Sequence, residues 1–331
     1  LKAEPNSLPV RLGQAQLDFA QKKFPQARDN LQEILKAAPN HGPAVLLMGA
    51  TQLSLESYVQ AETYLSTYVK AVPNNIYARR LLAATYLKNK QPAKALDTLK
   101  PLLAKDTQDG AVLALAGDAH LQLKEFAKAT ELLDRAAKAI PDNAAVRTEL
   151  ALSRMAAGDT ARGTAELEAA ADMAGSPLQT DVALVYALLS KQQYDKALKA
   201  VDALEKKQPD NPLAHNLRGG VYVGKQDFAS ARKAFEKALS LQPGYYPAAA
   251  NLAQLDLRDK NPQAARGRFD GILAADKNNV SAMVAIAEIE RAAGRENEYV
   301  AWLDTAPRAD AKALKPRSLL APSYAGQNHA P

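Results

Sequence analysis

The sequence has no cysteine and no long apolar run, and it has few aromatic residues. With no Cys among 331 residues, disulfides, thiolate catalysis and cysteine-ligated metal sites are excluded. No stretch approaches the roughly 18 consecutive apolar residues of a transmembrane helix, and no basic-then-apolar signal peptide is present. Aromatic residues make up 6 % of the chain, too few and too scattered for a row of sugar-stacking rings.

The composition is that of a folded helical protein. Hydrophobic residues account for 47 % and charged residues for 24 %, and Ala and Leu dominate together with Lys, Glu, Asp and Gln. These side chains lose little rotamer freedom in a helix. The net charge of +6 is spread over charges that alternate in sign, which indicates solvated helix faces and predicts no nucleic-acid partner. The length alone fits two ordinary domains or one extended array.

A repeat of 34 residues runs through the chain without insertion. Proline recurs at this spacing where a second helix should end, because it lacks the N–H that would continue the helix. Asn or Asp usually follows and is expected to cap the next helix. The recurring position is occupied by Pro39, Pro73, Thr107, Pro141, Gly175, Pro209, Pro243 and Lys277. The predicted repeats are 8–41, 42–75, 76–109, 110–143, 144–177, 178–211, 212–245, 246–279 and 280–313.

Within each repeat, small and large residues recur at fixed positions. Position 8 is small except at Val185, position 20 is small except at Tyr299, and position 24 is large and apolar, as in Leu133 and Phe235. Two helices that cross closely need small residues at the contact, and bulky neighbours fill the space beside it. The residues at position 8 are Ala15, Gly49, Ala83, Gly117, Ala151, Val185, Gly219, Ala253 and Ala287.

This pattern, with aromatic residues at position 11 such as Tyr86 and Tyr222, resembles the tetratricopeptide repeat (TPR) family over almost the whole chain. The resemblance implies an all-α fold, a right-handed α-solenoid (superhelix) of helical hairpins. It also implies a non-catalytic scaffold that binds partner proteins or peptides in a concave groove lined by the first helix of each repeat. The predicted groove residues are Leu12, Gln16, Phe19, Leu46, Leu53, Arg80, Leu87, Asp118, Leu121, Val182, Tyr186, Leu189, Asn216, Gln254 and Glu288.

Two alternatives limit this prediction of the groove. Residues at position 12, such as Leu53 and Leu87, can instead pack against the next repeat. The family's carboxylate clamp needs Lys and Asn where this chain has Leu46 and Ala50, and its asparagine ladder is represented only by Asn251. Both of these recognition devices are therefore disfavoured.

Residues that would support catalysis or metal binding are not grouped in the sequence. The four histidines are His41, His120, His215 and His329, and none has a second ligand at metal-site spacing. His41 is expected at a helix cap and His120 within a helix pair. No phosphate-binding glycine motif occurs. The chain is therefore predicted to have no enzymatic activity, cofactor or metal.

The two ends and two internal regions depart from the regular repeat. Residues 1–7 are predicted to end a preceding repeat, and 314–331 to form the first helix of a truncated tenth, so that self-association through uncapped ends is expected. The region 158–177, which carries Gly158 and Gly163, is predicted to be the loosest part and a candidate hinge. In the ninth repeat, Tyr299 at the small position should splay the hairpin and Pro307 should end its second helix early.

The sequence of the segment from Asn211 to Gln254 resembles a particular group of TPR proteins. Its Pro-Gly-Tyr-Tyr-Pro turn followed by Ala-Ala-Asn-Leu-Ala resembles the TPR lipoproteins of bacterial PEP-CTERM/exosortase and exopolysaccharide systems. This resemblance implies a periplasmic protein, membrane-anchored through a segment outside this sequence, that assists polymer export or PEP-CTERM protein sorting. The alternatives are a cytosolic peptide-binding adaptor and the TPR arm of a larger enzyme.

Overall fold

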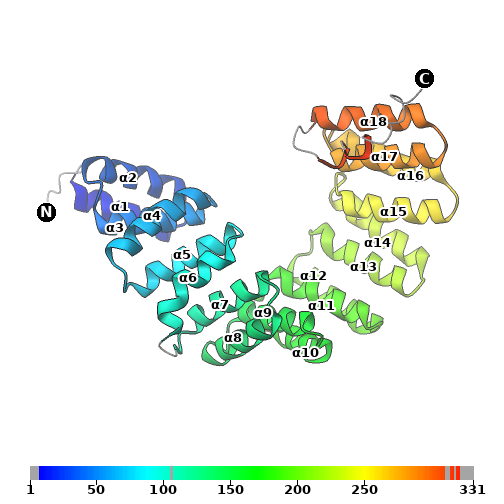
Figure 1. The fold of residues 1–331 in the computed structure, drawn as a ribbon. Coiled ribbons are helices and arrows are strands. Elements are labelled where there is room, and N and C mark those ends of the chain that lie inside the picture. Colours follow the sequence, from blue (N-terminus) through cyan, green and yellow to red (C-terminus); the bar gives the residue numbers. More distant parts are fainter. Residues whose placement is uncertain (1–6, 105–106, 310–313, 317, 321–331) are drawn as a thin grey trace, which may run out of the picture. The chain divides into compact units, whose positions relative to one another are not determined.

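The computed structural model describes residues 7–104, 107–309, 314–316 and 318–320, and all regular structure in these ranges is helical. The helices alternate between a first and a second helix of a hairpin (Figure 1). The first helices are α1 Leu8–Ala20, α3 Gly42–Ser54, α5 Ile76–Lys88, α7 Gly110–Gln122, α9 Ala144–Ala156, α11 Leu178–Ser190, α13 Pro212–Gly224, α15 Tyr246–Arg258 and α17 Val280–Ala292. The second helices are α2 Phe24–Ala37, α4 Tyr58–Ala71, α6 Pro92–Leu103, α8 Phe126–Ala139, α10 Thr160–Ala171, α12 Tyr194–Lys207, α14 Phe228–Leu241, α16 Pro262–Ala275 and α18 Glu296–Ala309.

The chain divides into two compact units, Leu1–Thr180 and Asp181–Pro331. Inside each unit a helix packs mainly on the helices before and after it in the chain, as expected for stacked hairpins. The predicted all-α solenoid of tandem hairpins is therefore confirmed within each unit.

The same left-handed turn joins the two helices of each hairpin. The second residue after each first helix has a positive φ. This residue recurs every 34 positions, from Lys22 to Gly294. In the turn after α7, Lys124 has φ 61° and the Glu125 N–H donates to the His120 carbonyl, which closes the helix in a Schellman motif. Seven of these nine turn residues are not glycine, so most of the turns carry some backbone strain.

Relief of this strain is a testable consequence. Lys124→Gly should stabilise the fold by about 1 kcal/mol, because glycine adopts a positive φ without the steric penalty of a Cβ. Urea denaturation of the full chain would measure the change. The matched control is Lys128→Gly, an exposed position inside α8, which should destabilise by about 1 kcal/mol. The same sign for both variants would contradict the strain at Lys124.

The hairpin crossing joins positions 8 and 24 of the repeat. A Cβ placed on Gly117 would lie 2.5 Å from Leu133 Cγ, and one on Gly49 would lie 2.5 Å from Leu65 Cγ. Real Cβ atoms do not approach other heavy atoms so closely, so the small residue is what permits the contact. Leu65 and Leu133 are fully buried, which places the core of each hairpin at this crossing.

The helix ends follow the predicted pattern. The prolines lie two residues after the second helix, as Pro73 does after α4 and Pro141 after α8. The next helix is capped by an asparagine whose side chain accepts from a backbone N–H: Asn75 from Ala78 at 2.9 Å, and Asn143 from Val146 at 3.1 Å. His41 caps α3 in the same way, accepting from the Ala44 N–H at 3.3 Å.

Two predicted irregularities are wrong. Helix α18 runs through Pro307 to Ala309, so the helix does not end at this proline. Its hairpin is not splayed either: Tyr299 is buried in one cluster with Ala287, Leu303 and Leu320, and its hydroxyl donates to the Leu319 carbonyl at 3.3 Å.

The region 158–177 is closely packed where α9 and α10 cross. A Cβ on Gly163 would lie 2.8 Å from the Ala151 carbonyl oxygen, so the glycine brings the two helices together instead of loosening them. Near the C-terminal end, residues 314–316 and 318–320 are helical. Residues 1–6 and 321–331, on which the rest of the predicted end structure depends, lie outside the described residues.

Candidate functional site

The predicted groove residues of the first unit all lie on first helices, but their exposure differs. Leu87 is buried against neighbouring helices, which favours the alternative that position 12 packs between repeats. Gln16 is exposed, and Phe19 contacts Phe24 edge-on with ring centroids 5.4 Å apart. The half-buried members are Leu12, Phe19, Leu46, Leu53, Arg80, Asp118 and Leu121.

In the second unit the predicted residues are more accessible. Tyr186 on α11 is 58 % exposed, unusual for a large side chain, and Gln254 on α15 is also exposed. Asn216 accepts a hydrogen bond of 3.0 Å from the Asn251 side chain, which links α13 and α15 along this face. The half-buried members are Val182, Leu189, Asn216 and Glu288.

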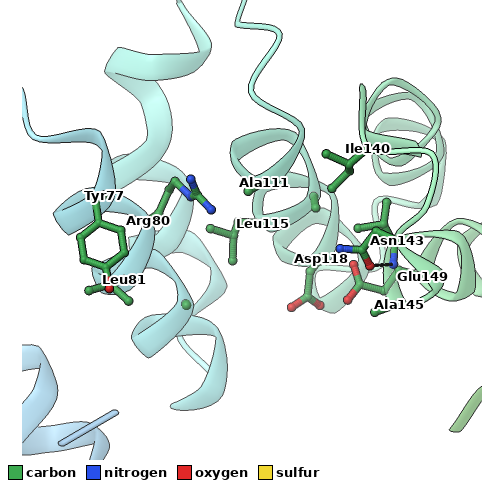
Figure 2. A pocket seen from close by; sticks show the side chains of 13 residues that line it. Tyr77, Arg80, Leu81, Ala111, Leu115, Asp118, Ile140, Asn143, Ala145 and Glu149 are labelled. Atoms are coloured by element: carbon green, nitrogen blue, oxygen red, sulfur yellow. Dashed lines mark hydrogen bonds between the residues drawn. The ribbon is translucent and has the colours of Figure 1, made fainter. Parts of the chain in front are cut away.

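A cavity of about 330 Å³ joins the first helices α5, α7 and α9 in the first unit. Arg80 of α5 and Asp118 of α7, both predicted groove residues, contribute to its wall together with Glu149 of α9 (Figure 2). Leu81 and Leu115 supply apolar surface between these charges. In Figure 2 the Asp118 and Glu149 carboxylates point toward the same part of the cavity from two different helices.

The electrostatics of this cavity centre on Glu149. Burial and the nearby Asp118 carboxylate raise the pKa of Glu149 to about 7, and Lys88 only partly offsets them. Arg80 does not neutralise the pair, since its guanidinium faces Asp109 at 3.7 Å. The cavity thus holds two carboxylates that repel each other in a partly desolvated place.

A second cavity, of about 360 Å³, lies between α15 and α17 in the second unit. The predicted residues Gln254 and Glu288 line it, while Tyr246 and Phe269 form a tilted ring pair with centroids 5.9 Å apart in its wall. Glu288 forms an ion pair with Arg291 at 2.5 Å. This cavity is mainly apolar, and its one carboxylate has a counter-ion.

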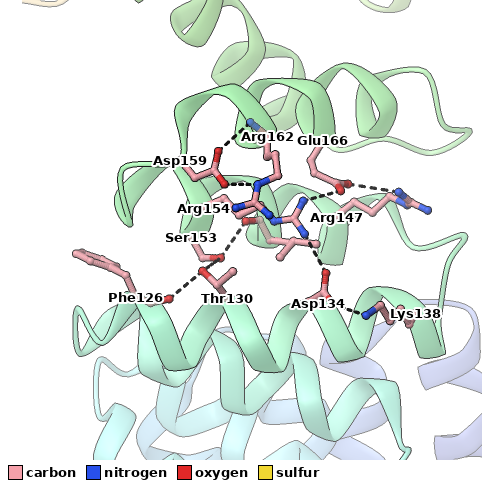
Figure 3. Close-up of polar contacts among 11 residues, drawn as sticks. Phe126, Thr130, Asp134, Lys138, Arg147, Ser153, Arg154, Asp159, Arg162 and Glu166 are labelled. Atoms are coloured by element: carbon pink, nitrogen blue, oxygen red, sulfur yellow. Dashed lines mark hydrogen bonds and ion pairs between the residues drawn. The ribbon is translucent and has the colours of Figure 1, made fainter.

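Other clusters of charged side chains hold hairpins together. Arg154 of α9 donates to Asp134 of α8 and to Glu166 of α10, each at 2.9 Å (Figure 3). Glu166 also receives Arg147 at 3.4 Å, and Asp134 receives Lys138 at 2.6 Å. Every charge in this network has a partner of opposite sign, which is typical of a structural junction.

The second unit repeats this arrangement around buried carboxylates at position 11. Asp256 lies between Arg232 of α14 and Arg268 of α16 at 2.5 and 2.9 Å. Glu290 lies in the same way between Arg266 and Arg295, and the Arg295 hydrogen bond holds the pKa of Glu290 below its usual value. The sequence analysis missed these junctions because it treated position 11 as an aromatic position. The recurring Arg at position 21, as in Arg232 and Arg266, was the available signal.

Comparison with known proteins accounts for the repeat. Family models described as tetratricopeptide repeat match residues 18–85, 86–152 and 222–283, and a second such model matches 182–246. These matches cover more than half of the chain. The chain belongs to the tetratricopeptide repeat family. No curated protein matches the sequence.

Solved TPR structures share the fold at low sequence identity. A tetratricopeptide repeat protein from Parabacteroides merdae is 13 % identical with a TM-score of 0.55, over 75 % of this chain and 98 % of that one. The C-terminal part of a TPR repeat-containing protein from Cytophaga hutchinsonii is 16 % identical with a TM-score of 0.50, over 72 % and 98 %. A chain of the APC/C hetero-tetramer Cut9-Hcn1 is 16 % identical with a TM-score of 0.49, and this chain spans only 63 % of its length. The two likenesses with TM-scores of 0.50 and 0.55 show the fold alone.

TPR repeats are typically non-catalytic modules for protein–protein interaction, so the family indicates an interaction scaffold. The likeness to PEP-CTERM-system lipoproteins finds no support in these comparisons. Among the helices described, none combines the length and apolar character needed to cross a membrane. The described residues contain no group of three or more His, Cys, Asp or Glu side chains arranged to hold a metal ion.

Proposed function

We propose that this TPR protein binds extended segments of partner proteins along the first-helix face of its repeats, without catalysis. The observation that carries this proposal is that a cavity in each unit is lined mainly by first helices. The cavity of the first unit involves α5, α7 and α9, and that of the second involves α15 and α17 together with Pro262 and Phe269 of α16. Each combines apolar surface with a few polar groups, the usual composition of a binding site.

Exposed tyrosines on a first helix of each unit support the proposal. Tyr77 of α5 is 52 % exposed and Tyr186 of α11 is 58 % exposed. Large aromatic side chains that keep one face accessible are enriched where proteins bind partners. Both lie on first helices, and Tyr77 also lines the first-unit cavity.

The test compares these tyrosines with an apolar residue on a second helix. The immobilised full chain would select from a library of displayed random peptides, and the affinities of the selected peptides would be measured for Tyr77→Asp/Tyr186→Asp. We expect an affinity loss of about tenfold or more, since aromatic anchors often contribute over 1 kcal/mol each. The control, Val59→Asp on α4, replaces a side chain of 66 % exposure and should leave binding unchanged. Equal losses in both proteins would place the binding surface elsewhere.

We further propose that the partners belong to an envelope system for exopolysaccharide export or PEP-CTERM protein sorting, with the protein anchored in the periplasm. The support is the resemblance of the sequence of residues 211–254 to TPR lipoproteins of these systems, in particular at the turn from Pro243 to Tyr246 that leads into α15. Fractionation of cells that carry the tagged natural gene would test the compartment. Recovery in the cytosol would contradict the proposal and favour a cytosolic adaptor.

A further inference from the structure

The carboxylates of the first-unit cavity lack the ion pairs that buried carboxylates of the second unit form. Asp256 and Glu290, which are buried in the second unit, each form ion pairs with two arginines. In the cavity, Asp118 accepts only the Gln122 side-chain amide, at 3.2 and 3.3 Å. Among the described residues, no Lys or Arg forms an ion pair with Asp118 or Glu149. The buried Asp18 also lacks a counter-ion, but two side-chain amides, from Gln14 and Asn30, donate to it. Asp118 and Glu149 instead share one cavity with neither an ion pair nor more than one side-chain donor between them.

The shape of the cavity is also specific. Its volume of about 330 Å³ is at the lower end for ligand pockets and suits one long side chain with the backbone that carries it. Ala84 and Ala114 contribute small side chains to its lining, and Leu81 and Leu115 contribute larger apolar ones. A lysine or arginine has the matching parts, an aliphatic stem that buries along apolar surface and a cationic head.

We propose that this cavity receives a lysine or arginine side chain of a partner's extended segment, whose charged end binds between Asp118 and Glu149. The inference rests on the proposed function and names the chemistry of the partner. Both carboxylates become paired on binding, which removes the cost of leaving them close together without a cation. Among the described residues, no third His, Cys, Asp or Glu side chain joins these two carboxylates in an arrangement that could hold a metal ion.

The experiment uses the full chain and displayed random peptides. The wild type, Asp118→Asn and Glu149→Gln each select from the same library, together with Glu131→Gln as a control at an exposed position of α8. Wild type and the control should enrich peptides that share one Lys or Arg position, and the two cavity variants should not. In a synthetic selected peptide, replacement of that Lys by norleucine should weaken wild-type binding about tenfold and binding to Asp118→Asn much less, because the charge-assisted contact is already lost.

Each outcome bears on the proposal in a defined way. Selection of peptides with no basic preference would overturn the inference while leaving the proposed function intact, whereas selection of no peptide at all would overturn both. Displacement of the peptide by magnesium chloride, but not by sodium chloride at equal ionic strength, would identify a divalent-cation site and also overturn it. If replacing Lys by norleucine lowers the affinity for Asp118→Asn as much as the affinity for wild type, the basic side chain binds elsewhere and the inference is overturned.

Discussion

Replacing Gly219 by valine is expected to destabilise the second unit by about 3 kcal/mol. A Cβ on Gly219 of α13 would lie well inside contact distance of three ring atoms of Phe235 on α14. Phe235 is 1 % exposed and packs in one cluster with Leu252 and Leu255 of α15, so the ring cannot move aside without displacing other core residues. Valine adds two further carbons at the same place, and α13 and α14 must separate to accept them.

The adjacent glycine provides the control. Gly220 lies on the same helix, and a Cβ there would meet no atom within 4 Å. Gly220→Val should therefore be neutral or slightly stabilising, because valine has a better helix propensity than glycine. Urea denaturation with hydrogen exchange of α13 and α14 would compare the two proteins. Similar stabilities for both would mean that the crossing tolerates larger residues than its geometry indicates.

Replacing Glu149 by glutamine is expected to stabilise the first unit at neutral and alkaline pH. A carboxyl group whose pKa rises from 4.5 unfolded to about 7 folded contributes stability that is full below pH 4.5 and is lost as the pH rises to 7. The loss amounts to about 3 kcal/mol, at 1.36 kcal/mol for each pH unit. Glutamine does not titrate, so the variant keeps this stability.

The measurement is the difference in unfolding free energy between Glu149→Gln and wild type from pH 4 to pH 9. The difference should increase between pH 4.5 and 7 in favour of the variant and then stay constant. Glu131→Gln, at an exposed position, should show no such change. A difference that does not vary with pH would mean that Glu149 ionises normally in the folded protein.

Much of the fold could be predicted because local rules recur in phase. A 34-residue spacing of prolines, asparagine caps and small residues fixes where helices begin, end and cross, and each rule acts over a few residues. The ninth hairpin could not be predicted in this way. Tyr299 fits the small position only because its ring packs with Leu303 and Leu320, and Leu320 comes from beyond the repeat.

The candidate site was less accessible to sequence reasoning. The predicted groove residues lie on the first helices, and Arg80, Asp118, Gln254 and Glu288 line the two cavities. Glu149 stands at position 6 and was missed, because its role depends on Asp118, which approaches from another repeat. The pKa of a carboxyl group depends on neighbours from other repeats, and a repeat pattern does not specify those neighbours.

The unvarying turn has a consequence for how such a protein can change its length. Every hairpin turn has a left-handed residue at the same position, and each first helix begins 34 residues after the previous one, so the repeats are equivalent in length and in their turns. Unequal recombination within the gene can therefore add or remove whole hairpins in frame without disturbing the stacking of those that remain. The reach of the binding face can evolve by duplication, while point substitutions on the first helices alter what it recognises.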